Sequence, residues 1–225
     1  MAHPGYKSEF FAYLLACAQA DDAIERLPSL NELSQELGLS VARLREQLEV
    51  SKALGFVEVR PRTGIRRLPY NFTAAVWPSL SYAIASDAST FATFSDLRIH
   101  LEKAYWQKAV AALTTEDHQH LQSLIDQAWE KLRGNPPHIP HHEHREFHLA
   151  IFHKLGNPFV MGLLEAYWDA YEAVGLSVYT DFGYLEKVWN YHKKMVQAIC
   201  AGEIEKGFQE LSAHFDLLYE RPTGA

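Results

Sequence analysis

Four histidines in the C-terminal half of the chain are spaced so that their imidazoles point into a protein core. His144 and His148 are four residues apart, so on a helix they share one face with apolar neighbours. His192 and His214 fall on two further helical segments, each among apolar residues at helical spacing. A single inward histidine is ordinarily a hydrogen-bonded core residue, but several together can satisfy their ring nitrogens by sharing a metal ion. The spacing of His144 and His148 also lets one helix chelate one ion.

A second pattern, near the N-terminus, is typical of contact with nucleic acid. Its capping residues are Ser29 with Glu32 for a first helix, Gly38 at the end of that helix and Ser40 for the next. The short turn between them predicts a helix-turn-helix, whose second helix enters a major groove. Arg43 and Arg45 lie near the start of that second helix, where they can either read guanine or hold phosphate.

A basic hairpin is expected directly after these two helices. Residues 56–59 alternate between apolar and polar types, an arginine-studded turn follows, and residues 65–67 complete the pattern. This predicts a wing beside the helix-turn-helix. The side chains that we expect to contact DNA in the helix and the wing are Arg43, Arg45, Arg62 and Arg66, with Ser40 and Thr63 as phosphate contacts.

The histidines need helices to position them, and the rest of the chain supplies a helical pattern. From residue 94 onward we expect helices at about 94–113, 115–133, 140–155, 158–179, 184–201 and 203–219, separated by Gly, Asn and Pro. No strand pattern competes with them. The predicted fold is therefore mostly α: a winged helix-turn-helix over 1–68, a linker and lead-in helix over 69–93, and an all-helical bundle over 94–220.

The charge distribution is compatible with DNA binding although the chain is acidic overall. The net charge is −7, yet residues 43–67 carry 7 Lys and Arg against 3 Asp and Glu. The two cysteines, Cys17 and Cys200, are far apart and are expected to be small buried apolar residues. No signal peptide or membrane-length apolar run is present in the sequence, so a cytoplasmic protein without a membrane partner is expected.

The N-terminal pattern resembles the winged helix of the GntR family of bacterial transcription regulators. The resemblance is carried by Leu27-Pro28-Ser29, Leu37-Gly38-Leu39-Ser40, Leu44-Arg45-Glu46 and Gly55-Phe56-Val57. The family commonly has arginine after the turn serine and proline two residues later, whereas this chain has Val41 and Arg43. A contact to DNA at this point can therefore differ from that of the family.

The segment from residue 94 to 219 resembles the FCD effector domain of the FadR-like branch of the same family. The matching residues are Leu97-Arg98 with Glu102, Phe147-His148, Gly156-Asn157-Pro158, His192, Ala198-Ile199, Gly202 and His214. In that branch an aspartate and three histidines bind a divalent metal, and a small carboxylate effector often completes its coordination. Carried over position by position, the ligands here would be His144, His148, His192 and His214, with His144 in place of the aspartate.

Histidine at position 144 makes this donor set richer in nitrogen and one unit more positive. Such a donor set favours Zn, Ni or Cu over Mg or Mn, and it should attract an anionic effector more strongly. Two alternatives stay open: His144 points away and water completes a three-histidine site, or no metal binds, as in some members of the branch. Arg98 either grips the effector carboxylate or forms a surface i, i+4 ion pair with Glu102.

These patterns together predict a DNA-binding transcription regulator, expected to be a repressor, whose operator binding is controlled by a carboxylate effector at a metal site. A homodimer is expected, because one winged helix buries too little surface to be specific and a two-fold dimer matches a roughly palindromic operator. The alternative is a metal-dependent helical hydrolase or oxygenase, which would leave the winged helix unexplained. A helical adaptor would explain neither pattern.

Overall fold

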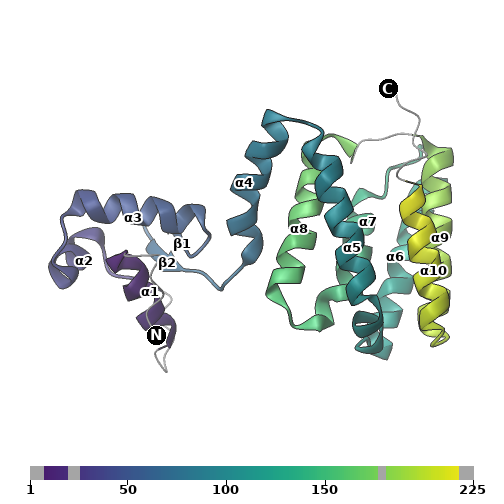
Figure 1. Ribbon diagram of the computed structural model, residues 1–225, viewed down its shortest axis with the longest axis horizontal. Coiled ribbons are helices and arrows are strands. Elements are labelled where there is room, and N and C mark those ends of the chain that lie inside the picture. Colours follow the sequence, from purple (N-terminus) through teal and green to yellow (C-terminus); the bar gives the residue numbers. More distant parts are fainter. Residues whose placement is uncertain (1–7, 20–25, 177–180, 218–225) are drawn as a thin grey trace. The chain divides into compact units, whose positions relative to one another are not determined.

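The computed structural model describes residues 8–19, 26–176 and 181–217 (Figure 1). The chain forms two compact units, Met1–Pro78 and Ser79–Ala225, which are called the N-terminal unit and the C-terminal unit below. Most of the described residues are helical, and the sheet that they include has two strands. The predicted fold class, mostly α with a winged helix-turn-helix before a helical bundle, is confirmed.

The N-terminal unit contains the predicted helix-turn-helix and wing. Its elements are α1 (Glu9–Gln19), α2 (Leu30–Leu37), α3 (Val41–Ala53), β1 (Val57–Arg60) and β2 (Gly64–Arg67), and the strands are antiparallel. Ser29 and Glu32 form the expected capping box at the start of α2. Gly38 ends α2 in the left-handed conformation, and the Ser40 side chain caps α3. Local capping therefore sets both helices of the motif.

Helix α1 was not predicted from the sequence, although a signal for it exists. Its buried residues Phe10, Leu14 and Cys17 follow helical spacing, and the amide of Phe11 donates to the hydroxyl of Ser8. The three residues pack with Leu33 and Leu44, which are fully buried, in the core of the unit. Helix α1 therefore belongs to the folded head. Cys17 is buried as expected, whereas Cys200 is exposed, contrary to the prediction.

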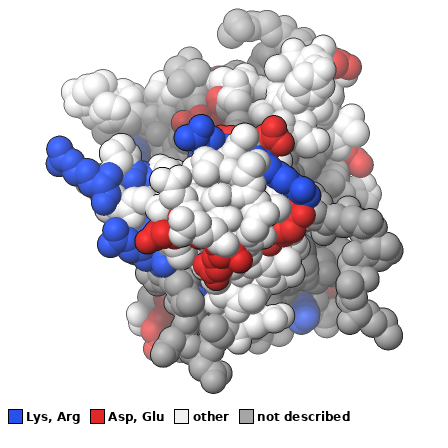
Figure 2. All heavy atoms as spheres, turned by 90° about the vertical axis from the view of Figure 1, so that its left-hand side faces the viewer, with Lys and Arg blue, Asp and Glu red and all other residues white. Residues whose placement is uncertain are grey.

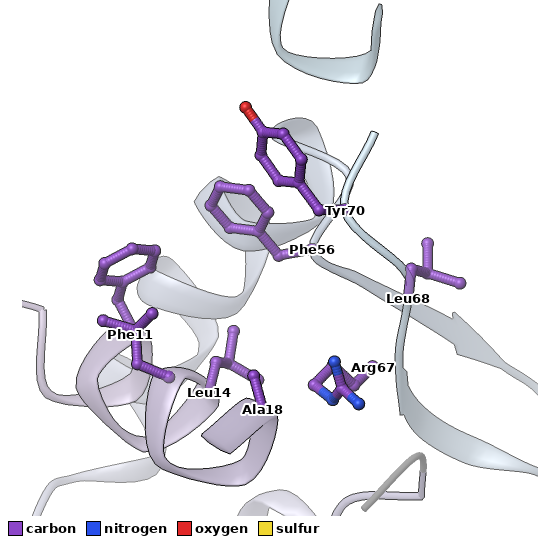
Figure 3. Close-up of a pocket in the computed structure, with 8 residues that line it drawn as sticks. Phe11, Leu14, Ala18, Phe56, Arg67, Leu68 and Tyr70 are labelled. Carbon is purple, nitrogen blue, oxygen red and sulfur yellow. The ribbon is translucent and has the colours of Figure 1, made fainter. Parts of the chain in front are cut away.

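An apolar pocket of about 270 Å³ lies beside α1 in the N-terminal unit (Figure 3). Its lining residues are Phe11, Leu14, Leu15, Ala18, Phe56, Arg67, Leu68 and Tyr70. Arg67 is the one charged residue among them. The pocket is thus a gap between α1 and the chain that leaves β2, and it holds no cluster of acid, base or metal-binding groups.

The C-terminal unit is a helical bundle preceded by the lead-in helix α4 (Phe72–Ser86), which spans the division between the two units and contains Pro78. The later elements are α5 (Thr90–Ala111), α6 (Thr115–Arg133), α7 (His141–Phe152), the short 3₁₀ helix η1 (His153–Leu155), α8 (Pro158–Ala173), α9 (Phe182–Cys200) and α10 (Ile204–Asp216). No described helix combines the length and the apolar character that crossing a bilayer requires.

Helix boundaries follow the sequence prediction closely where capping residues mark them. The capping box of Thr114 and Asp117 starts α6, and Asn157 caps α8. Helix α5 begins four residues before the predicted start at 94, and α8 ends at Ala173, short of 179. Residues 177–179 and 218–219 of the predicted helices lie outside the described part of the chain.

The bundle core places the faces of α5, α7, α8, α9 and α10 around a common interior. Helix α9 packs against α6 and α10, and α5 packs against α7, α8 and α10. The largest fully buried side chains, Trp106, Trp168 and Trp189, come from α5, α8 and α9. Burial of aromatic rings is the main source of stability in such a core. The helices that carry the histidines are therefore held by extensive apolar packing.

We expect Gly55→Ala to destabilise the N-terminal unit more than Gly38→Ala. Both glycines have positive φ, at +71° and +65°, so each alanine incurs a backbone cost of about 1–2 kcal/mol. A Cβ at position 55 would in addition overlap the Cβ of Ala74. A Cβ at position 38 would have no described heavy atom within 4 Å apart from those of its chain neighbours. The overlap should add roughly 1–3 kcal/mol.

Native-state hydrogen exchange of amides in α2, α3 and β1 measures this difference, with Gly38→Ala as the matched control. Equal losses of protection in the two variants would show that the contact between Gly55 and Ala74 contributes nothing.

Candidate metal centre and nucleic-acid interface

The four histidines singled out in the sequence meet in the interior of the C-terminal unit. Helix α7 supplies His144 and His148, α9 supplies His192 and α10 supplies His214. One ring nitrogen from each lies within 4.8 Å of the other three. His148 and His192 are fully buried, His214 is 3% exposed, and His144 is half-buried. We call this group the histidine cluster.

Ring positions show that the cluster is compact. The centroids of His192 and His214 are 4.5 Å apart, and those of His144 and His192 are 4.9 Å apart. Aromatic rings enclose the cluster: Trp168 meets His144 edge-on at 4.7 Å, and Trp189 meets His192 at 4.8 Å. The imidazoles are thus set in a largely apolar wall, away from bulk water.

One histidine of the cluster is tied to a buried carboxylate. The Nδ1 atom of His148 lies 3.0 Å from Oε2 of Glu102, which is fully buried on α5. The other oxygen of Glu102, Oε1, accepts a hydrogen bond of 2.6 Å from Nε of Arg98. An ionised carboxylate can only accept hydrogen bonds, so Nδ1 of His148 carries the proton and Nε2 keeps its lone pair.

The environment favours neutral imidazoles beside an ionised carboxylate. Burial lowers the pKa of His148, against the opposing effect of Glu102. Burial, followed by the neighbouring His214 and His144, pulls the pKa of His192 well below its usual value. Burial alone would raise the pKa of Glu102, but the attraction of Arg98 and His148 holds it below the usual value. A divalent ion requires this protonation state of its histidine ligands.

The residues of the cluster fit a divalent metal ion. Nε2 of His148 and both ring nitrogens of His192 are buried without a hydrogen-bond partner among the described residues. Metal–nitrogen bonds are about 2.1 Å long, so the nitrogens of four tetrahedral ligands are about 3.4 Å apart. The four donors here all lie within 4.8 Å of one another, so small shifts of the rings would bring them to one ion. All four donors are imidazoles, the ligand type that suits Zn, Ni and Cu.

The sequence left two roles open for Arg98, and the structure excludes one of them: a surface ion pair with Glu102. Its side chain is 3% exposed and pairs with the fully buried Glu102. The guanidinium lies 4.4 Å from the ring centroid of Tyr167 and 5.2 Å from that of Trp168. Its Nη2 atom is buried without a hydrogen-bond partner in the described chain. Four-residue spacing on a helix is the same for an exposed and a buried pair, so the sequence could not distinguish them.

A fifth histidine, His141, lies near the cluster and was not among the ligands predicted from the sequence. It lies in the first turn of α7, where its ring stacks on Tyr171 with centroids 5.8 Å apart and planes 5° from parallel. His141 and His144 line a small cavity together with Tyr171 and Trp189. The i, i+3, i+7 spacing of His141, His144 and His148 was the signal that could have placed it on the cluster side of α7.

The predicted DNA-contacting residues lie on α3 and the wing of the N-terminal unit, in different settings. Arg45 is exposed on α3 and has no hydrogen bond or ion pair among the described residues, whereas Arg43 pairs with Glu9 at 2.6 Å. Arg62 and Thr63 are exposed in the turn between β1 and β2, and Arg66 is half-buried opposite Glu58. The Ser40 hydroxyl accepts from the amide of Arg43.

Two polar residues near the recognition helix were missed from the sequence. Glu9 of α1 contacts Arg43, and it also accepts from Nε2 of Gln47 at 2.7 Å. Gln47 Oε1 accepts from the amide of Phe10, so it joins α3 to α1. On the face of the molecule in Figure 2, basic side chains project from one edge while acidic side chains border the centre. The basic surface is therefore not continuous.

Comparisons with known proteins assign the C-terminal unit to a domain family and find solved structures with a similar fold. Residues 94–217 match the model of the FCD domain family. The structure is similar to Streptococcus agalactiae GntR, with a TM-score of 0.67, 16% identity, and coverage of 93% of this chain and 94% of that one. It is also similar to E. coli McbR/YncC, with a TM-score of 0.52, 18% identity, and coverage of 96% and 97%. No curated protein matches the chain.

The FCD match covers more than half of the chain and includes the whole histidine cluster. The two structural similarities show a shared fold across both units. GntR-family proteins are transcription regulators and not enzymes, so the metal-dependent enzyme is set aside. The chain belongs to the FCD domain family, joined here to an N-terminal winged helix as in the GntR-family regulators that it resembles.

Proposed function

We propose that this protein is a homodimeric, cytoplasmic transcription repressor whose binding to a DNA operator is controlled by a small carboxylate effector at a metal centre. The observation that carries the proposal is the convergence of His144, His148, His192 and His214 inside a domain that follows a winged helix. The domains that correspond to this function are the winged helix at 1–68, the lead-in segment at 69–93 and the metal-binding bundle at 94–220.

The metal is held by the four histidines of the cluster. An all-imidazole donor set favours Zn or Ni over Mg or Mn, since the latter prefer oxygen ligands. A bound ion would supply a positive charge to the site, and a carboxylate oxygen would bind it as a further ligand beside the four imidazoles. His144 is the least buried donor and lines the small cavity with His141, so this side of the cluster is the entrance for the effector.

An anionic effector fits the polar groups beside the cluster. Nη2 of Arg98 and Nε1 of Trp168 are buried donors without acceptors in the described part of the chain. Both side chains lie near the cluster, since the Trp168 ring is 5.4 Å from His148 and 5.2 Å from the Arg98 guanidinium. A carboxylate offers acceptors alone, so it complements a site with surplus donors.

Control of DNA binding requires the effector to favour one arrangement of the C-terminal unit. A coupling free energy of about 1–3 kcal/mol is sufficient, which a few altered contacts supply. Helix α5 carries Arg98 and Glu102 and begins at Thr90, shortly after α4 ends at Ser86. A shift of α5 on effector binding therefore reaches the lead-in helix through a short connection, and from there the spacing of two winged helices in a dimer.

Metal content of the purified chain is the first test of the proposed function. Elemental mass spectrometry should find about one Zn or Ni per chain, and His148→Ala should lose it because a buried donor is removed. His144→Asp should retain metal, because a carboxylate replaces one imidazole as a ligand.

His120→Ala serves as the control, since His120 is exposed on α6, and its metal content should equal that of the wild type. A well-folded wild-type chain without metal after loading with Zn or Ni would exclude the metal centre and leave the four histidines with a structural role alone.

Arg45→Ala should weaken DNA binding, because Arg45 is exposed on α3 and unpaired among the described side chains. If Arg45 binds phosphate, the slope of log affinity against log salt should fall by about 0.9 for all duplexes. If it reads a base, the loss should be about 1–3 kcal/mol on a selected operator and small on mixed-sequence DNA.

Fluorescence anisotropy with both duplexes over a salt series separates these cases. Lys108→Ala, which removes an exposed positive charge from α5, is the control and should leave both curves unchanged. Identical affinities of Arg45→Ala and wild type on both duplexes would remove Arg45 from the interface.

Glu9→Gln should strengthen DNA binding through Arg43. The substitution removes the charge that holds the guanidinium of Arg43, while the amide oxygen can still accept from Gln47. The salt slope on mixed-sequence DNA should become steeper by up to about 0.9, as for one added phosphate contact. A double-mutant cycle with Arg43→Ala measures the coupling, and an equal gain in that background would show that Arg43 is not involved.

A further inference from the structure

We propose that Glu102 is a positioning residue for the histidine cluster, which holds His148 in its metal-binding tautomer and places a negative charge behind a donor set that has none. The inference rests on the proposed metal centre and goes beyond its ligand set. It assigns Glu102 a role that acts through His148, not through direct contact with the ion.

The geometry joins Glu102 both to Arg98 and to one histidine of the cluster. The side chain is fully buried on α5, in the middle of the bundle core. Each oxygen has a single partner of opposite charge or polarity: Oε1 accepts from Nε of Arg98 at 2.6 Å, and Oε2 faces Nδ1 of His148 at 3.0 Å. Burying a carboxylate costs several kcal/mol unless such partners are present. The chain therefore maintains a costly group directly behind one ligand of the cluster.

The hydrogen bond decides which nitrogen of His148 can bind a metal ion. A neutral imidazole has one proton, and the carboxylate of Glu102 requires it on Nδ1. Nε2 then has a free lone pair, and it is buried without a hydrogen-bond partner among the described residues. A carboxylate behind a ligating histidine also raises the basicity of the donor nitrogen and fixes the ring orientation.

The composition of the cluster gives this carboxylate a second effect. Four neutral imidazoles contribute no negative charge to a divalent ion. Glu102 is fully buried and joined to a donor by one hydrogen bond, so solvent screens its charge little at the site. Arg98 reduces this effect, but it also restrains the carboxylate, since its guanidinium is stacked 4.4 Å from the Tyr167 ring centroid.

A purely structural role for Glu102 is the competing explanation, in which it only neutralises Arg98. The chain offers a matched control for this possibility. Glu143 is also a buried carboxylate, 2% exposed, and it pairs with Lys131 at the same distance of 2.6 Å. No hydrogen bond joins Glu143 to a histidine of the cluster among the described contacts. Loss of its charge removes an ion pair in which the carboxylate is buried and the lysine is 41% exposed, without affecting the support of a ligand.

Binding of Zn and Ni by the full chain, measured by competition with a chelator, tests the inference. Glu102→Gln should keep about one ion per chain and weaken its binding by about 10–100-fold. The double variant Arg98→Met/Glu102→Gln should show the same weakening without leaving an unpaired buried guanidinium. Glu143→Gln should bind metal like the wild type, even if its melting temperature falls.

The tautomer of His148 supplies a readout that a structural role would not change. Imidazole nitrogen shifts in NMR spectra should place the proton of the wild-type, metal-free chain on Nδ1, and in Glu102→Gln this preference should weaken. Equal metal affinity of Glu102→Gln and wild type, or equal loss in Glu143→Gln, would overturn the positioning role while the metal centre stands. A folded wild type that binds neither ion overturns both.

Discussion

The structure of the C-terminal unit depends on the need to satisfy imidazoles that have been removed from water. His148, His192 and His214 are at most 3% exposed, and uncompensated burial of a polar ring costs about 1–3 kcal/mol. The packing of three helices brings their ring nitrogens to within 4.8 Å of one another, so one ion can satisfy them together. Helices α7, α9 and α10 are thus linked by a polar requirement as well as by apolar contacts.

Burial of the pair formed by Arg98 and Glu102 extends this constraint to α5. Removing either charge alone would leave the other in a low-dielectric core, which is more costly than the pair itself. The hydrogen bond of Glu102 to His148 then joins α5 to α7 at the level of the cluster. The same interactions that stabilise the bundle therefore determine the orientation of one proposed ligand, so the stability of this core and the proposed metal binding would not be independent.

The sequence predicted those features that depend on local chemistry. Ser29, Ser40 and Thr114 mark helix starts because capping is decided within four residues. The inward direction of the histidines followed from helical periodicity. Burial of Arg98 and the contact of Glu9 with Arg43 depend on which helix packs opposite, and spacing along one helix contains no such information.

Charge balance explains why metal and effector binding should depend on each other. Imidazole ligands add no negative charge, and the ion pair of Arg98 and Glu102 has no net charge, so a divalent ion would leave two positive charges in a buried site. An isolated charge in such an environment is strongly unfavourable, and the donors Nη2 of Arg98 and Nε1 of Trp168 add to the demand for acceptors. A carboxylate from solution would both offset the positive charge and accept hydrogen bonds from these donors. The histidine at position 144, where the branch that this domain resembles has aspartate, increases that demand by one charge and should make the anion a stronger determinant of metal affinity.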